Sequence, residues 1–95
     1  AKRAAPHLLR VECEVTTMDE LRAALAAGAD VVLLDNMDDD MVREALDIVG
    51  GRIPVEVSGG VSLERLPRLA AMGVDFVSVG ALTHSVRAAD LSLLF

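Results

Sequence analysis

Short apolar stretches alternate along the chain with longer segments in which apolar residues recur every three or four positions. The short stretches are rich in β-branched residues or alternate apolar with polar side chains, which is typical of strands. They occupy residues 10–15, 30–34, 53–57 and 75–79. Between them, the helical spacing predicts helices over residues 18–27, 41–49 and 62–72, and a short amphipathic segment over residues 86–94.

Polar residues and glycines mark the ends of these helices. Thr17 and Glu20 have the spacing of a capping box. The acidic residues 38–40 favour the start of the second helix, because carboxylates stabilise the positive end of a helix dipole. Pro67 removes a backbone donor at the fifth position of the third helix, so that helix either starts after Ser62 or is kinked in its first turn.

Strands that alternate with helices of this length, joined by short glycine-marked turns, predict α/β architecture with a parallel sheet. The segment 26–32 is also echoed by the segment 71–77, the kind of repeat from which (β/α)₈ barrels are built. A full barrel needs roughly 250 residues. We therefore expect residues 1–95 to form one partial domain, about half of a TIM-type barrel and incomplete by itself. A doubly wound open sheet remains possible, although no GxGxxG fingerprint supports a dinucleotide site.

The composition narrows the classes of partner and compartment. A formal net charge of −6 argues against binding to nucleic acid, whose phosphates need basic surfaces. The uninterrupted apolar run at residues 31–34 is far shorter than the ~20 residues of a membrane span. Cys13 is the single cysteine and cannot form an internal disulfide, so we expect a packing role for it in a reducing cytoplasm.

The alternation of the strands predicts carboxylates inside the barrel. If Cys13 and its apolar neighbours pack on the helices, Glu12, Glu14 and Glu56 point inward, and Asp35 ends the second strand. Ionised carboxylates there are costly unless they meet cations, a metal or hydrogen-bond donors. Eight of the nine basic residues lie on predicted helices or loops. We infer that the missing cations come from chain beyond this segment, from Mg²⁺, or from both. Protonated or backbone-paired glutamates are the alternative.

Glu14 and Asp35 lie nearest the carboxyl ends of their strands, where barrel enzymes keep their catalytic groups. Two carboxylates on neighbouring strand ends suit a hard cation that keeps several waters and binds substrate oxygens. These two residues are the candidate catalytic and Mg²⁺-binding groups.

Two glycine turns end the third and fourth strands. Ser58, Gly59 and Gly60 follow one strand, and Gly80 and Ala81 follow the other. Glycine permits close backbone approach and the serine hydroxyl adds a donor, so together the turns could hold a phosphate monoester. Tight turns without a ligand are the alternative.

Residues 83–85, with His84 in the middle, are expected to cap the helical segment 86–94. A strand that ends in glycine and opens a helix presents backbone N–H groups and a positive dipole to one point. His84 could donate to the same phosphate or simply cap the segment.

Four motifs, in their order and spacing, resemble the C-terminal part of the quinolinate phosphoribosyltransferases, also called nicotinate-nucleotide pyrophosphorylases (carboxylating). The motifs are VECEV at 11–15, LDNM at 34–37, VSGG at 57–60 and VGALTHS at 79–85. The resemblance covers essentially the whole chain. It implies transfer of phosphoribose from phosphoribosyl pyrophosphate to quinolinate with loss of CO₂, which yields nicotinate mononucleotide and pyrophosphate for NAD biosynthesis.

The same resemblance implies roles for single residues. Glu14 and Asp35 would hold the ribose hydroxyls and Mg²⁺. The 5′-phosphate would contact Ser58, Gly59, Gly60, Gly80 and Ala81, with His84 nearby. In the family, the grip on quinolinate and pyrophosphate comes from an N-terminal domain and earlier barrel strands, and the enzyme is a homodimer. The chain is therefore expected to carry only the phosphoribose and Mg²⁺ half of the site. A non-catalytic phosphate-binding half-barrel fragment is the alternative.

Overall fold

The computed structural model describes residues 11–80 and 82–86. They form one five-stranded sheet in the order β1-β2-β3-β4-β5. The strands are β1 (Glu12–Val15), β2 (Val31–Asp35), β3 (Val55–Ser58), β4 (Phe76–Val79) and β5 (Leu82–Ser85). The first four run parallel and β5 runs antiparallel to β4. The α/β prediction is confirmed, since sequential parallel strands in this order are what part of an α/β barrel requires.

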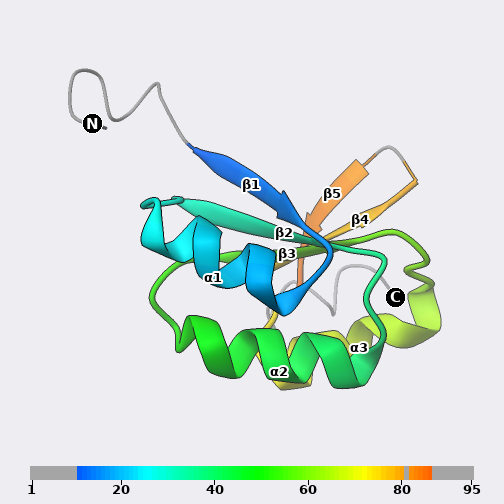
Figure 1. Cartoon of the computed structure of the whole chain (residues 1–95). Helices are drawn as coiled ribbons and strands as arrows, with labels where there is room; N and C mark the ends of the chain where they lie inside the picture. The colour runs from blue at the N-terminus through cyan, green and yellow to red at the C-terminus, as the bar shows by residue number, and fades with distance from the viewer. Residues whose placement is uncertain (1–10, 81, 87–95) are drawn as a thin grey trace.

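All three helices lie on one side of the sheet (Figure 1). They are α1 (Met18–Ala26), α2 (Asp39–Val49) and α3 (Leu66–Met72), the last preceded by the 3₁₀ turn η1 (Leu63–Arg65). In the described part of the chain, no helix has the length and apolar character needed to cross a bilayer.

Polar side chains cap the first two helices, as the sequence predicts. The Thr17 hydroxyl accepts the Glu20 backbone N–H at 3.1 Å, and the Glu20 carboxylate reaches back to the Thr16 N–H at 2.6 Å. Asp38 caps α2 by accepting the Met41 N–H at 2.9 Å. α3 starts at Leu66, so Pro67 falls in its first turn, where a missing N–H leaves no bond unmade. Of the two alternatives for Pro67, the later start is correct.

The prediction that residues 83–85 cap a helix is wrong, because they belong to strand β5. Gly80, at a φ of 64°, lies in the turn that leads back along β4. Thr83 then pairs with Ser78 and His84 with Val77. A short glycine-containing turn after a strand favours a hairpin, and ladder bonds to β4 replace the predicted cap. Apart from the buried Val86, the predicted helix 86–94 lies outside the described residues.

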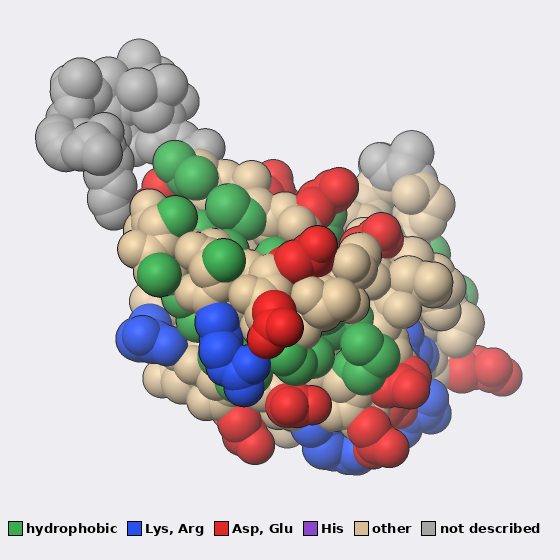
Figure 2. Space-filling view, viewed as in Figure 1, with side chains coloured by type: hydrophobic (Ala, Val, Ile, Leu, Met, Phe, Trp, Pro, Cys, Tyr) green, Lys and Arg blue, Asp and Glu red, His purple; other side chains and the backbone are tan. Residues whose placement is uncertain are grey.

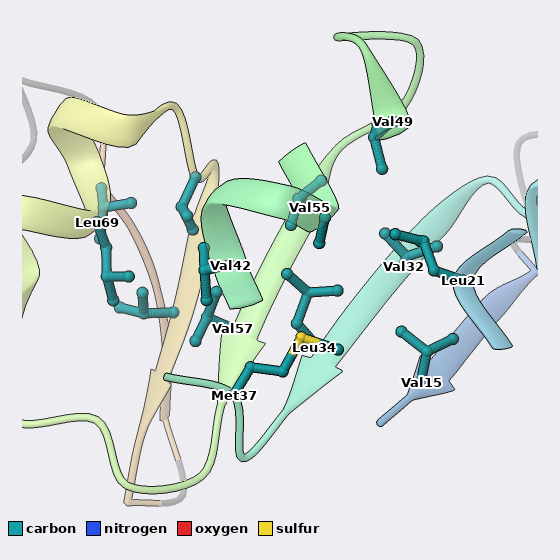
Figure 3. Close-up of a cluster of buried hydrophobic side chains, with 14 of the residues drawn as sticks. Val15, Leu21, Val32, Leu34, Met37, Val42, Val49, Val55, Val57 and Leu69 are labelled. Atoms are coloured by element: carbon teal, nitrogen blue, oxygen red, sulfur yellow. The ribbon is translucent and has the colours of Figure 1, made fainter. Parts of the chain in front are cut away.

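The core lies between the sheet and the helices (Figure 3). Alternate strand residues supply its sheet side, and each is at most 2% exposed: Val15, Val32, Leu34, Val55, Val57 and Val77. Leu21 of α1, Val42 of α2 and Leu69 of α3 face them and are fully buried. Cys13 is half-buried and packs against this cluster, as predicted.

The internal repeat has a structural role. The Asp30 carboxylate accepts the backbone N–H of Val11, the residue before β1, at 2.9 Å. The Asp75 carboxylate accepts the N–H of Val55, the first residue of β3, also at 2.9 Å. The backbone N–H groups of the two aspartates in turn donate to the carbonyls of the same two valines. Each aspartate therefore fixes the start of its own strand against the neighbouring strand.

We expect Asp75→Ala to destabilise the chain by about 1–3 kcal/mol, because the half-buried Val55 N–H then loses its acceptor. Urea unfolding followed by circular dichroism measures the change. Asp47→Ala, at an exposed position on α2, is the control and should stay within about 0.5 kcal/mol of the wild type. Equal effects of the two substitutions would contradict this role for Asp75.

Candidate functional site

The face of the sheet away from the helices carries the predicted carboxylates. Partnered residues in a parallel sheet point to the same side. Glu14 is level with Leu33 of β2, Leu33 with Glu56 of β3, and Glu56 with Phe76 of β4. Glu14 is exposed and Glu56 half-buried. In Figure 2 acidic side chains lie both on the upper, sheet side of the molecule and over the helices, whereas the basic ones lie only in the lower part, over the helices.

Asp35 and Ser58 are brought together at the carboxyl ends of β2 and β3. They are register partners, and the Ser58 hydroxyl donates to the Asp35 carboxylate at 3.5 Å. Glu14 lies on the same face, level with the β2 residue two positions before Asp35. The two candidate carboxylates therefore share one face of the sheet, and Asp35 is the one next to the serine-glycine turn.

The turns that follow β2 and β3 interlock. Gly59 has a φ of 81°, and a side chain there would place its Cβ 3.0 Å from Asp35 Oδ1 and 3.1 Å from the Asn36 nitrogen. Asn36 has a φ of 58°, and its N–H donates to the Ser58 carbonyl at 2.9 Å. Gly60, at a φ of 69°, continues the turn. Glycine at position 59 thus lets the backbone close directly against Asp35 and Asn36.

Asn36 was missed as a site residue by sequence reasoning, although a signal was present. It directly follows the strand-ending Asp35, and asparagine tolerates the left-handed conformation better than most residues. Its conformation turns the chain so that its N–H reaches the carbonyl of Ser58. Asn36 therefore joins the two turns.

The other predicted phosphate residues occur in the sequence at and after the end of β4. Gly80 is exposed at the end of β4, and Ala81 lies outside the described residues. His84 is level with Val77, which belongs to the helix-facing side. The register therefore sets His84 on the side of the sheet opposite to Glu14 and Glu56.

A second polar group occupies the middle of the open face. The Ser78 hydroxyl donates to the Glu56 carboxylate at 2.7 Å and lies 3.2 Å from the Thr83 hydroxyl. Glu56 and Thr83 also line a hollow of about 240 Å³, together with Glu12, Val31 and Phe76. Sequence reasoning missed the two hydroxyls, because Thr83 reaches this face only through the unforeseen strand β5. Glu56 is hydrogen-bonded, but to a side-chain hydroxyl and not to the backbone donors that the alternative for the inward glutamates named.

Arginines approach the site only from the helix side. Arg65 of η1 donates to Asp39 Oδ1 and to the Met37 carbonyl, each at 2.7 Å, and Arg68 donates to Asp39 Oδ2 at 2.9 Å. These hydrogen bonds, the one from Arg65 first, hold the pKa of Asp39 below its usual value. Across residues 11–80 and 82–86, every arginine lies on a helix or on the loop after α2, and no strand carries an arginine or a lysine.

Glu14 and Asp35 fit part of a Mg²⁺ site. Both are carboxylates on one face of neighbouring strands, and the Ser58 hydroxyl adds an oxygen beside Asp35. Within the described segments no group of three or more His, Cys, Asp or Glu side chains could hold a metal ion. Mg²⁺ is typically held by one or two carboxylates, with waters and substrate oxygens as the other ligands. The donor set therefore suits a cation that arrives with its ligand.

Asp39 should make stability depend on pH. Because its pKa is lowered in the folded state, its stabilising contribution is complete above about pH 4 and is lost as the pH falls through the lowered pKa. The gap in unfolding free energy between the wild type and Asp39→Asn should therefore shrink below pH 4, as measured by urea unfolding at several pH values. Asp40→Asn is the control, since that exposed carboxylate pairs only with Arg43 of its own helix. A gap that stays constant down to pH 2 would contradict this.

Gly59→Ala should be far more damaging than Gly28→Ala. Both glycines have a similar positive φ, so alanine costs about 1 kcal/mol at either one. A Cβ at Gly28 meets nothing within 4 Å, whereas one at Gly59 presses on Asp35 and Asn36 and adds about 1–3 kcal/mol. Thermal unfolding measures the loss of stability in each variant. Equal losses in the two variants would contradict the close contact of Gly59 with Asp35 and Asn36.

Comparison with known proteins gives a consistent result. The sequence matches the family described as quinolinate phosphoribosyl transferase, C-terminal domain, over residues 1–94. It is 44% identical over 93 residues to a probable nicotinate-nucleotide pyrophosphorylase (carboxylating) of Bacillus subtilis and 38% identical over 96 residues to the human enzyme of that name. Each match covers 98% of this chain and 32% of the relative.

Solved structures agree. The nicotinate-nucleotide pyrophosphorylase of Francisella tularensis matches with a TM-score of 0.68 at 40% identity, covering 80% of this chain and 29% of that one. NadC of Streptococcus pyogenes matches with a TM-score of 0.71 at 30% identity, covering 93% of this chain and 30% of that one. The chain thus spans about a third of the length of these relatives. On its sequence and its fold alike, it belongs to the quinolinate phosphoribosyltransferase C-terminal domain family.

Proposed function

We propose that this chain supplies the phosphoribose half of a quinolinate phosphoribosyltransferase site. In this proposal the whole enzyme converts quinolinate and phosphoribosyl pyrophosphate into nicotinate mononucleotide, pyrophosphate and CO₂. The single observation that carries it is the contact of Asp35 and Asn36 with the turn at Ser58 and Gly59, which sets a carboxylate beside a glycine turn.

The turn after β3 suits a phosphate monoester. Gly59 and Gly60 carry no side chains, so a ligand can approach their backbone N–H groups closely. The Ser58 hydroxyl, now directed at Asp35, is a further donor within the same turn. Gly80 and Ala81 would close the phosphate pocket from β4. His84 enters only through the family resemblance, since the register sets it on the helix-facing side.

The carboxylates suit the ribose ring. Glu14 and Asp35 share the open face, where they would accept hydrogen bonds from the ribose hydroxyls. Departure of pyrophosphate leaves positive charge on the ribose, and fixed carboxylates stabilise charge where it develops. Bound Mg²⁺, held by the same two carboxylates, would neutralise the leaving pyrophosphate.

The chain requires partners to complete such a site. Among the residues described, no strand carries an arginine or a lysine. Quinolinate and pyrophosphate are both anions, and their binding needs such cationic groups. We therefore assign the quinolinate half to the N-terminal remainder of the enzyme. Homodimer assembly and cytoplasmic location stay predictions.

A second candidate function is phosphate binding without catalysis by the half-barrel alone. It is favoured by the serine-glycine turn, which closes against Asp35 and Asn36 within the described residues. It differs from the first in needing no second segment.

A complementation assay tests the proposal. The chain is combined with the N-terminal two-thirds of the Bacillus subtilis relative, and nicotinate mononucleotide is measured with Mg²⁺ present. We expect product, and roughly 10²-fold less from Asp35→Asn. Asp47→Asn, exposed on α2, is the control and should keep wild-type activity.

Calorimetry with ribose 5-phosphate separates the two functions. Binding by the chain without turnover in a well-folded complex favours the second candidate. Neither binding nor turnover would overturn both, and full activity in Asp35→Asn would overturn the assignment of that residue.

A further inference from the structure

Arg65 makes a contact that the proposed function does not use. It lies on η1, five residues after Gly60, and its side chain is only 11% exposed. Its guanidinium donates in two directions at once, from Nε to Asp39 Oδ1 and from Nη2 to the Met37 carbonyl, both at 2.7 Å. Two short charge-assisted bonds from one planar group fix both the distance and the angle between the segments that they join.

Those segments are the ones that carry the candidate site. Met37 lies two residues after Asp35 and is itself 2% exposed, so its carbonyl belongs to a rigid part of the loop after β2. Asp39 is the first residue of α2. Arg65 reaches both from the segment that follows the glycine turn of β3. The guanidinium thus ties the loop of the candidate carboxylate to the segment of the candidate phosphate turn.

Arg68 binds the same carboxylate as Arg65 but is not bonded to the Met37 carbonyl. It donates to the other oxygen of Asp39 at 2.9 Å, but its side chain is 59% exposed. Among the described residues, Arg68 forms its hydrogen bond with Asp39 and none with the loop between Asp35 and Asp38. The two arginines therefore share a partner and a charge, and differ in burial and in the bond to the Met37 carbonyl.

We propose that Arg65 is a positioning residue that holds the Asp35–Asn36 loop against the Ser58–Gly60 turn. The importance of this positioning for catalysis rests on the proposed function. The link that Arg65 makes between the two segments is a property of the unliganded chain. Arg65 touches neither Asp35 nor the turn directly. It acts through the Met37 carbonyl and the start of α2, by preventing the loop from moving away from Gly59.

The first measurement needs no ligand. Amide spectra of the ¹⁵N-labelled chain should show shifts and faster hydrogen exchange at Asn36, whose N–H is bonded to the Ser58 carbonyl, in Arg65→Ala. Arg68→Ala is the matched control, because it removes the same charge from the same carboxylate. It should leave the Asn36 amide as in the wild type.

Arg65→Lys keeps the charge but lacks the fork that spans two acceptors. It should therefore resemble Arg65→Ala at Asn36, and it decides the question if Arg65→Ala does not fold. An unchanged Asn36 amide in Arg65→Lys would overturn the proposal.

The second measurement concerns the ligand. Ribose 5-phosphate should bind about tenfold more weakly to Arg65→Lys than to Arg68→Ala, the size expected for loss of one charge-assisted hydrogen bond. Equal affinities in the two variants, where binding occurs, would overturn the positioning role. If the wild-type chain binds no ribose 5-phosphate, the proposed function fails, while the exchange of the Asn36 amide still supports or overturns the link made by Arg65.

Discussion

The parallel register between β2 and β3 is the constraint on which the site depends. It makes Asp35 and Ser58 partners at the last level of both strands, so the turns that follow start side by side. From there, a bond from the Asn36 N–H to the Ser58 carbonyl and the missing side chain of Gly59 bring the two backbones into contact. A slip of one residue would turn every side chain of β3 to the other face and bury Glu56 in the core.

Several features of this arrangement were readable from the sequence. Period-two alternation on strands and helical spacing between them separate core from open face, and the fully buried Val32, Val57 and Val77 follow that pattern. The caps at Thr17 and Asp38 were equally local, because each of these side chains accepts a backbone N–H that lies only three residues later. Features that a few neighbouring residues determine could therefore be predicted.

What failed depends on contacts between distant segments. Residues 83–85 satisfy the local rules for a helix cap, yet their pairing with β4 prevails, and no pattern within those residues shows that partner. The same holds for Ser78, whose hydroxyl bonds to Glu56 of another strand, and for Asn36. Arg65 and Met37 are 28 positions apart in the sequence. Their link also uses a backbone carbonyl, which every residue carries, so no residue type in the sequence indicates it.

The distribution of charge explains why one face of the sheet can carry function. The helix-facing side is closed by apolar packing, and the arginines of the described residues are used there to fix helix starts and loops, as Arg65 does at Asp39. The open side holds carboxylates and hydroxyls with no arginine or lysine from the described strands. A carboxylate whose charge is balanced within the fold attracts a further cationic group less strongly than one that is not. Glu14 and Asp35, on the open side, form no ion pair within the described residues, which is the arrangement that the proposed binding of a metal or of a ribose requires.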